Sequence, residues 1–222
     1  MTNKHFDIPF YKYEKSLKDQ PFLRQPYGNK WKVYTWKEAG ILARKLATGL
    51  KSLGLKEKSH IGLISKNCAE WIIADLAIMM SGHISVPFFP NLKSNEIKHL
   101  IDFGDIKALF VGKLEGNWSE MKEGIDIDNL PIIAFPHYEG NSIVNEGFQW
   151  HDFINKFDPQ KDNYYPLNND IWTIIFTSGT TGDSKGAVIK YESLSNTSEV
   201  HESYNPLGID MNGKNRMISY LP

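Results

Sequence analysis

The sequence predicts an α/β fold in which a mostly parallel sheet is flanked by helices on both faces. Short apolar runs typical of strands alternate with helical patterns through the first 112 residues. Such alternation is characteristic of parallel strands joined by crossover helices. A later apolar run, at residues 171–176, leads directly into a loop rich in glycine and hydroxyl side chains. A chain of 222 residues is long enough for one large domain of this kind.

The clearest helix is expected over residues 35–53. Thr35 and Glu38 have the spacing of a capping box, in which each side chain accepts a hydrogen bond from the other residue's backbone amide. Gly54 follows where a left-handed C-terminal cap is expected. Apolar residues at three- and four-residue intervals define one buried face: Ala39, Leu42, Ala43, Leu46, Ala47, Leu50 and Leu53.

The alternation continues with a helix that is apolar nearly all round, at residues 69–82, which indicates burial on most sides. Asn67 and Glu70 mark the expected start of this helix. Residues 1–30 hold no clear period. The remaining expected elements are strands at 60–65, 83–89, 107–112, 130–135 and 171–176, and helices at 94–105 and 148–157.

Three parts of the chain differ in pattern. The regular alternation loosens after residue 112, and the stretch at 158–170 is polar and rich in turn residues, as a connector is. The expected division is an αβ subdomain at 1–112, an irregular connector and strand at 113–169, and a strand, glycine loop and following helix at 170–222.

Composition argues against several classes of protein. The formal net charge of −1 provides no global basic field that would attract nucleic acid. The single cysteine, Cys68, excludes an internal disulfide and a cysteine metal cluster, and its apolar surroundings predict a buried, inert thiol. The histidines are scattered without a metal-ligand spacing, and His83, in a loop before a strand, is expected to have a hydrogen-bonded structural role.

Targeting patterns are also lacking. The N-terminal residues have neither a long apolar core nor a cleavage-type pattern of small residues, so no signal peptide is expected. No apolar run approaches the roughly 20 residues of a membrane span. These observations favour a cytoplasmic location.

The loop after the strand at 171–176 carries the most specific signal. Residues 177–186 contain five hydroxyl side chains, three glycines and one lysine, Lys185. Glycines let backbone amides approach an anion closely, hydroxyl groups donate hydrogen bonds, and an ammonium group neutralises phosphate charge. The spacing is not that of a Walker A loop, because Ser184 stands where the second glycine would be. The pattern predicts a different phosphate-binding loop, with an unliganded hairpin turn as the alternative.

The string FTSGTTGDSKG at residues 176–186 resembles the phosphate-loop signature of the adenylate-forming superfamily, which includes acyl-CoA synthetases, luciferases and peptide-synthetase adenylation domains. Segments at 34–55, 61–82 and 84–112 are similar, in order, to the early N-terminal segments of long-chain fatty-acyl-CoA ligases. The terminal RMISYLP resembles the start of a further motif of those ligases. The resemblance covers most of the chain and implies part of the large N-terminal domain of an adenylate-forming enzyme.

This resemblance implies a reaction. The family joins a carboxylate to ATP with release of pyrophosphate, and the thiol of coenzyme A then displaces AMP; Mg²⁺ accompanies the ATP. Preorganised donors would neutralise the departing pyrophosphate. Lys185 is the implied catalytic residue, and Thr181 is the implied metal-facing hydroxyl. The implied phosphate-binding residues are Thr177, Ser178, Gly179, Thr180, Thr181, Gly182 and Lys185.

Two positions depart from the family pattern. Ser184 replaces the usual proline before the lysine, and Lys190–Tyr191 replaces a common Thr-His pair, which removes any role borrowed from that histidine. The family's adenine, ribose, metal-glutamate and C-terminal lysine motifs lie beyond Pro222. The expectation is therefore an N-terminal fragment that does not turn over alone.

Other functions stay open at this stage. One is an adenylation domain with a carrier-protein acceptor, another is a non-catalytic nucleotide- or phosphate-binding module, and a third is a purely structural domain. For the ligase, the expected partners are ATP, a fatty acid and CoA, without nucleic acid. Peripheral membrane association and a homodimer of the full enzyme are further expectations.

Overall fold

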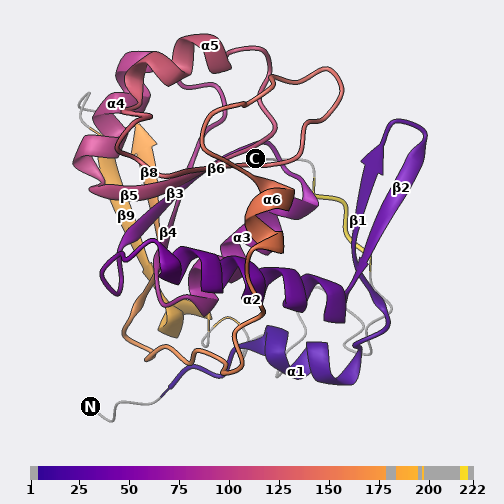
Figure 1. Cartoon of the computed structure of the whole chain (residues 1–222). Coiled ribbons are helices and arrows are strands. Elements are labelled where there is room, and N and C mark those ends of the chain that lie inside the picture. Colours follow the sequence, from indigo (N-terminus) through magenta and orange to yellow (C-terminus); the bar gives the residue numbers. More distant parts are fainter. Residues whose placement is uncertain (1–4, 179–183, 195–196, 198–215, 220–222) are drawn as a thin grey trace.

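The computed structural model describes residues 5–178, 184–194, 197 and 216–219, and it confirms the α/β prediction (Figure 1). The helices and strands are α1 (Pro9–Ser16), β1 (Pro21–Tyr27), β2 (Lys30–Thr35), α2 (Trp36–Ser52), β3 (His60–Ile64), α3 (Ala69–Met80), β4 (Ile84–Phe88), α4 (Ser94–Phe103), β5 (Ile106–Val111), α5 (Trp118–Met121), η1 (Lys122–Gly124), β6 (Ile132–Ala134), β7 (Phe148–Gln149), α6 (Trp150–Asn155), β8 (Ile171–Ser178) and β9 (Ser184–Lys190).

The main sheet has seven strands in the order β7-β6-β5-β3-β4-β8-β9. Neighbouring strands from β7 to β8 pair in parallel, and only β9 is antiparallel, where it turns back along β8 at the sheet edge. Because parallel strands share one direction, their carboxyl ends meet at a single edge of the sheet. This edge is where ligands bind in open α/β sheets.

Helices cover both faces of the sheet, as expected. One apolar core joins the sheet to α1, α2, α3 and α6, and it includes the fully buried Leu46, Ile73 and Phe110. A second core on the opposite face joins it to α4 and α5 through Ile97 and Met121. The sheet is thus a middle layer whose interior strands are buried on both sides, which is the usual environment of parallel strands.

Helix α2 confirms the local prediction in detail. The hydroxyl of Thr35 accepts a hydrogen bond from the Glu38 amide at 3.1 Å, and the Glu38 carboxylate accepts one from the Thr35 amide at 2.8 Å. Gly54, just after the helix, has a φ of +70°. Glycine adopts this left-handed conformation without the steric cost that a Cβ brings, so it ends the helix where the pattern predicts.

The first 35 residues contain structure that periodicity did not reveal. Helix α1 and the antiparallel pair β1–β2, a two-stranded sheet of its own, precede α2. The threefold division of the chain stays a prediction, although residues 113–169 contribute β6 and β7 to the same main sheet as the flanking parts. None of the helices in the described part of the chain is long and apolar enough to cross a membrane.

Two predictions about single side chains have different outcomes. Cys68 is buried, and burial raises the pKa of its thiol to about 12, as an inert cysteine requires. His83 is also buried, but the hydrogen-bonded role expected for it is wrong, because neither ring nitrogen has a partner among the described residues. Burial lowers the pKa of His83 and favours the neutral imidazole.

Candidate nucleotide-binding site

The hydroxyl- and glycine-rich loop joins β8 to β9 at the carboxyl edge of the sheet. Thr177, near the end of β8, lies directly opposite Lys185 on β9, and the Thr177 hydroxyl donates to the Lys185 carbonyl over a long 3.5 Å. Both residues are exposed. The pairing places a hydroxyl-bearing residue and a basic residue opposite each other at the base of the loop, and both residue types are suited to binding a phosphate.

The rest of the predicted phosphate-binding set is placed only in part. Ser178 is the last residue of β8, and its backbone pairs with Ser184 at the start of β9. Gly179, Thr180, Thr181 and Gly182 lie outside the described residues. The antiparallel pairing identifies the loop as a hairpin connection, which fits both a phosphate loop and the alternative of an unliganded turn.

The base of the β8–β9 hairpin packs against apolar side chains of the main sheet. Phe176 on β8 is buried and stacks on Phe88 of β4, with ring centroids 5.9 Å apart and planes 7° from parallel. Gly186 lies across from Phe176, and a Cβ at Gly186 would come within 3.1 Å of Ile174 and 3.3 Å of Phe176. A side chain there would crowd these neighbours, so glycine lets β9 pack closely against β8.

Other polar residues follow the neighbouring strands at this edge. Lys66 comes after β3, and Lys113 comes after β5 with its ammonium nitrogen 5.2 Å from the centre of the Tyr138 ring. The Asn67 amide donates to the hydroxyl of Ser219 at 3.0 Å. Ser219 belongs to the RMISYLP segment, so this residue of the motif lies against the turn after β3.

Tyr191, which replaces a histidine common in the family, has a packing role. Its side chain is 2% exposed, its ring centre is 5.4 Å from that of Phe6, and its amide donates to the Asp170 carbonyl at 3.1 Å. Burial raises the pKa of the Tyr191 hydroxyl far above the neutral range. The residue therefore anchors the end of the β8–β9 hairpin as a neutral phenol.

Glu70 has a role that sequence analysis missed. Helix α3 begins at Ala69 after an N-cap at Cys68, and the Glu70 carboxylate, instead of capping the helix, is fully buried. It accepts hydrogen bonds from Tyr34 at 2.8 Å, from Tyr27 at 3.2 Å, and from Tyr138. The tyrosines come from β1, β2 and the segment after β6, so only the folded chain brings them together.

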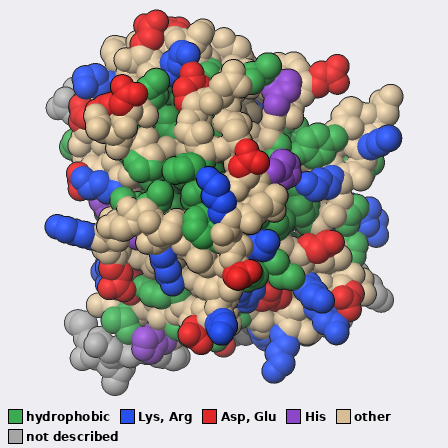
Figure 2. All heavy atoms as spheres, in the orientation of Figure 1, with side chains coloured by type: hydrophobic (Ala, Val, Ile, Leu, Met, Phe, Trp, Pro, Cys, Tyr) green, Lys and Arg blue, Asp and Glu red, His purple; other side chains and the backbone are tan. Residues whose placement is uncertain are grey.

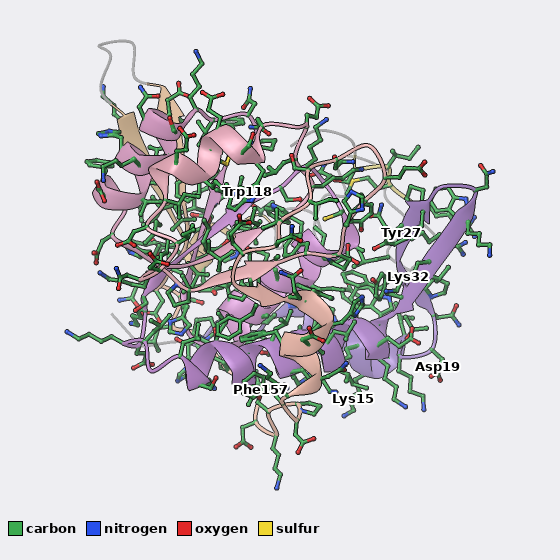
Figure 3. All side chains as sticks on the ribbon, turned by 45° about the horizontal axis from the view of Figure 1, so that its top comes forward. Lys15, Asp19, Tyr27, Lys32, Trp118 and Phe157 are labelled. Carbon is green, nitrogen blue, oxygen red and sulfur yellow. The ribbon has the colours of Figure 1, made fainter. Side chains whose placement is uncertain are left out.

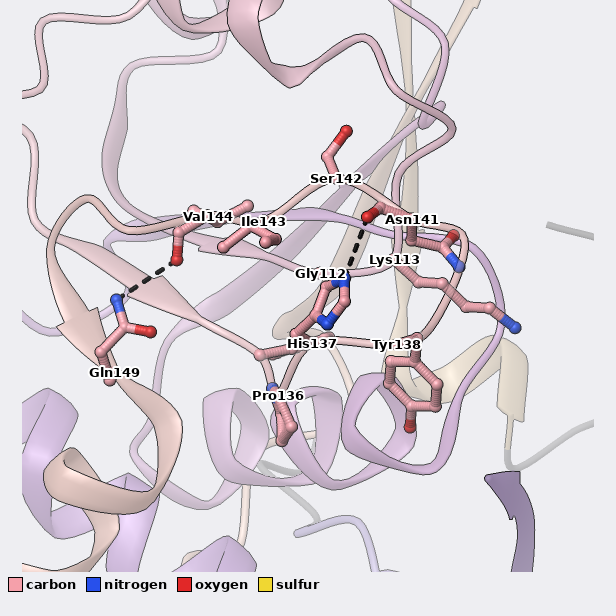
Figure 4. A pocket seen from close by; sticks show the side chains of 11 residues that line it. Gly112, Lys113, Pro136, His137, Tyr138, Asn141, Ser142, Ile143, Val144 and Gln149 are labelled. Atoms are coloured by element: carbon pink, nitrogen blue, oxygen red, sulfur yellow. Dashed lines mark hydrogen bonds between the residues drawn. The ribbon is translucent and has the colours of Figure 1, made fainter. Parts of the chain in front are cut away.

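A small pocket opens beside this cluster, after β5 and β6 (Figure 4). Lys113, His137 and Tyr138 are among its lining residues. The His137 ring contacts the Asn141 carbonyl at 3.1 Å, so part of its polar lining is already engaged. Three strand spacings separate β5 from β8 in the sheet, about 14 Å in all. The pocket is thus distinct from the β8–β9 loop.

The residues at the base of the β8–β9 loop have the chemical groups that bind a nucleotide polyphosphate. The exposed Lys185 and Thr177 offer the positive charge and the hydroxyl donor that a polyphosphate takes. In the described ranges no group of three His, Cys, Asp or Glu side chains is placed to hold a metal ion. Mg²⁺ bound with a nucleotide usually takes its ligands from the phosphates, water and one or two carboxylates.

Comparison with known proteins identifies the family. The model described as AMP-binding enzyme matches residues 11–222, so this chain belongs to the AMP-binding enzyme family. It is 29% identical over 204 residues to long chain acyl-CoA synthetase 5 of Arabidopsis thaliana, covering 86% of this chain and 30% of the relative. It is 27% identical over 201 residues to fatty acyl-CoA synthetase A of Dictyostelium discoideum, covering 86% and 29%.

Solved structures agree on the fold. An anthranilate CoA ligase in complex with anthranoyl-AMP matches with a TM-score of 0.73 and 19% identity, over 86% of this chain and 35% of that one. A benzoate CoA ligase from Burkholderia xenovorans matches with a TM-score of 0.71 and 17% identity, over 93% and 38%. The chain spans about 30% of the length of the curated relatives named above.

Proposed function

We propose that the protein takes part in the ATP-dependent activation of a carboxylic acid. The acid is a long-chain fatty acid, which is converted first to an acyl-adenylate and then to its CoA thioester. The observation that carries this proposal is the family match over residues 11–222 together with Thr177 and Lys185, paired at the base of the β8–β9 loop. The names of the relatives, long chain and fatty acyl-CoA synthetases, support the fatty acid as the substrate class.

The roles of the residues follow from their chemistry. Lys185 would neutralise charge on the β- and γ-phosphates, and Thr177 and Ser178 would donate hydrogen bonds to them together with the loop residues Gly179, Thr180 and Gly182. Thr181 would face the Mg²⁺ ion. Such donors lower the barrier because they stabilise the charge that develops on the departing pyrophosphate.

The binding of adenine, the transfer to CoA, dimer formation and a cytoplasmic location stay predictions. The matched region covers only 30% and 29% of the two relatives named above. We expect the 222-residue chain to bind ATP without completing a turnover. Reading the coding sequence past the codon for Pro222 checks this expectation: a stop codon there would favour a binding module.

The test compares two lysines of one strand. Lys185→Ala should weaken binding of MgATP to the chain at least tenfold in isothermal titration calorimetry, because it removes the cation at the loop. Lys190→Ala is the matched control, since Lys190 is an exposed residue at the opposite end of β9. If the two variants bind MgATP with equal affinity, Lys185 does not contact the nucleotide, and the proposed phosphate loop is wrong.

A further inference from the structure

The β1–β2 hairpin stands clear of the main sheet, on the side of the molecule opposite β9 (Figure 1). Gly28, with a φ of +54°, forms the tight turn at its tip. Its inner face is held to the body, because Tyr34 and Tyr27 donate to Glu70, and the Gln25 side chain accepts a hydrogen bond from the Ala69 amide at 2.9 Å. The hairpin is therefore firmly attached, although it projects.

The outer face of the hairpin consists of Arg24, Pro26, Trp31 and Val33. Pro26 pairs with Trp31 and Arg24 with Val33 across the two strands, and residues directly opposite each other share one face. All four are exposed, with Trp31 at 66% and Val33 at 40%. A large aromatic and an aliphatic side chain thus lie in water on an element that projects from the fold.

The charged side chains of the hairpin and its flanking residues are all basic. From Gln20 to Lys37 the chain contains four basic residues and no Asp or Glu. Lys30 and Lys32 are exposed on the strand opposite Arg24, and Tyr27 and Lys32 are labelled on the hairpin in Figure 3. In Figure 2 blue side chains mark this edge of the molecule. The whole chain has a formal net charge of −1, so this is a local concentration of positive charge.

Three of the acidic groups on the adjoining elements are paired or buried, whereas Glu139, next to Tyr138, is exposed. Asp19 precedes β1 and lies 3.8 Å from the ammonium group of Lys18. Glu38 lies in the first turn of α2 and is engaged by the amide and hydroxyl of Thr35. Glu70 is fully buried beneath the hairpin. The surface that the hairpin presents to solvent is therefore apolar and basic.

We propose that the outer face of the β1–β2 hairpin docks on the surface of an anionic lipid bilayer. Tryptophan settles at the headgroup level because its ring is apolar and its indole N–H finds polar partners there. Each basic residue near an anionic surface strengthens binding by roughly fivefold. Lys30 and Lys32 lie on the strand opposite Arg24 and add to the positive charge of the hairpin.

A bilayer fits these features better than an acidic protein or a nucleic acid. The exposed Trp31, Val33 and Pro26 bring apolar surface to an element that projects from the body. The proposal stands on the hairpin alone and does not depend on the substrate of the enzyme. It gives a definite site to the membrane association expected for the full enzyme.

Vesicle sedimentation tests the proposal with the 222-residue chain. Phosphatidylcholine vesicles containing one third phosphatidylserine should pellet the chain, and pure phosphatidylcholine vesicles should pellet much less of it. Arg24→Glu with Lys30→Glu should weaken binding at least tenfold, and Trp31→Ala several-fold. Lys56→Glu with Lys161→Glu is the matched control, because it changes the net charge equally at two exposed lysines elsewhere.

A spectroscopic measurement identifies the side chain that enters the bilayer. Brominated lipid should quench part of the tryptophan emission, and Trp31→Phe should abolish that part while the protein still pellets. Equal loss of binding in the control variant, or no binding to anionic vesicles, would overturn the proposal. The proposal would also be overturned if the chain bound soluble heparin as tightly as it binds vesicles and if Trp31→Ala left the affinity for heparin unchanged. This result would indicate a polyanion as the partner.

Discussion

The two antiparallel hairpins in the described part of the chain are attached to the body in contrasting ways. The β8–β9 hairpin belongs to the main sheet, and apolar packing of Phe176 and Tyr191 supports it. The β1–β2 hairpin is a separate sheet whose inner face is held by hydrogen bonds from Tyr27 and Tyr34 to one buried carboxylate. The β1–β2 hairpin pairs with no further strand among the described residues, so contacts of its side chains attach it to the body.

Two carboxylates on α3 extend the contrast. Glu70 is fully buried and accepts three tyrosine hydroxyl groups. Asp75, about one and a half turns further on, lies near Tyr191 at the end of the β8–β9 hairpin, and desolvation raises its pKa to about 6. Hydrogen-bond donors around a buried carboxylate offset part of the cost of removing it from water.

The largest effect is expected from Glu70→Ala. Three tyrosine hydroxyls would lose their acceptor, and we expect the free energy of unfolding to fall by about 3–5 kcal/mol in urea titrations. Trypsin should cleave first at the exposed Arg24, because the hairpin would detach before the sheet opens.

Tyr34→Phe provides the matched control for Glu70→Ala. It removes one donor and keeps the ring, so the loss should be about 1–2 kcal/mol. If Glu70→Ala costs no more than Tyr34→Phe, the carboxylate is not the common anchor of the hairpin, and the contrast between the two hairpins fails.

Asp75→Asn should act in the opposite direction and depend on pH. The pKa of Asp75 is raised from 3.8 to about 6 in the fold, so the folded state retains a proton that the unfolded state has released. Ionisation of Asp75 therefore costs stability as pH rises from about 4 through 6. The variant should gain roughly 1–3 kcal/mol at about pH 7 and little at about pH 4. Urea midpoints measured at both pH values check this sign, and an equal change at the lower pH would contradict it.

His83 should give a smaller pH effect of opposite slope. Burial lowers its pKa below the ordinary 6.5, so below that pH the unfolded chain binds a proton that the folded chain resists. Stability should therefore fall as pH drops from about 7 to about 5.5. His83→Phe should remove this part of the pH dependence of the melting temperature, and an unchanged slope would show that His83 does not titrate in the fold.

The smallest effect on stability is expected from Lys185→Ala. The side chain is exposed at the base of the loop, so its removal should change the free energy of unfolding by less than about 0.5 kcal/mol. A large loss would mean that Lys185 supports the β8–β9 hairpin, and its effect on ATP binding would then need a structural explanation.

The sequence alone determined the features that depend on near neighbours. The capping box of Thr35 and Glu38, the stop at Gly54 and the alternation of strands and helices were all predicted, because each is a pattern within one or two turns of chain. The phosphate-loop string was equally local, but the extent of the loop was not, because Thr177 and Lys185, expected within the loop, lie on β8 and β9.

The tertiary structure decided what depends on distant partners. The cluster around Glu70 joins it to tyrosines that are 36 to 68 positions away in the sequence. The lack of hydrogen-bond partners for the His83 ring among the described residues is likewise a result of tertiary packing. The apolar and basic outer face of β1–β2 could not be read from a segment without clear periodicity. Strand order, the antiparallel return of β9 and the burial of polar groups arise from long-range packing, which local sequence patterns do not encode.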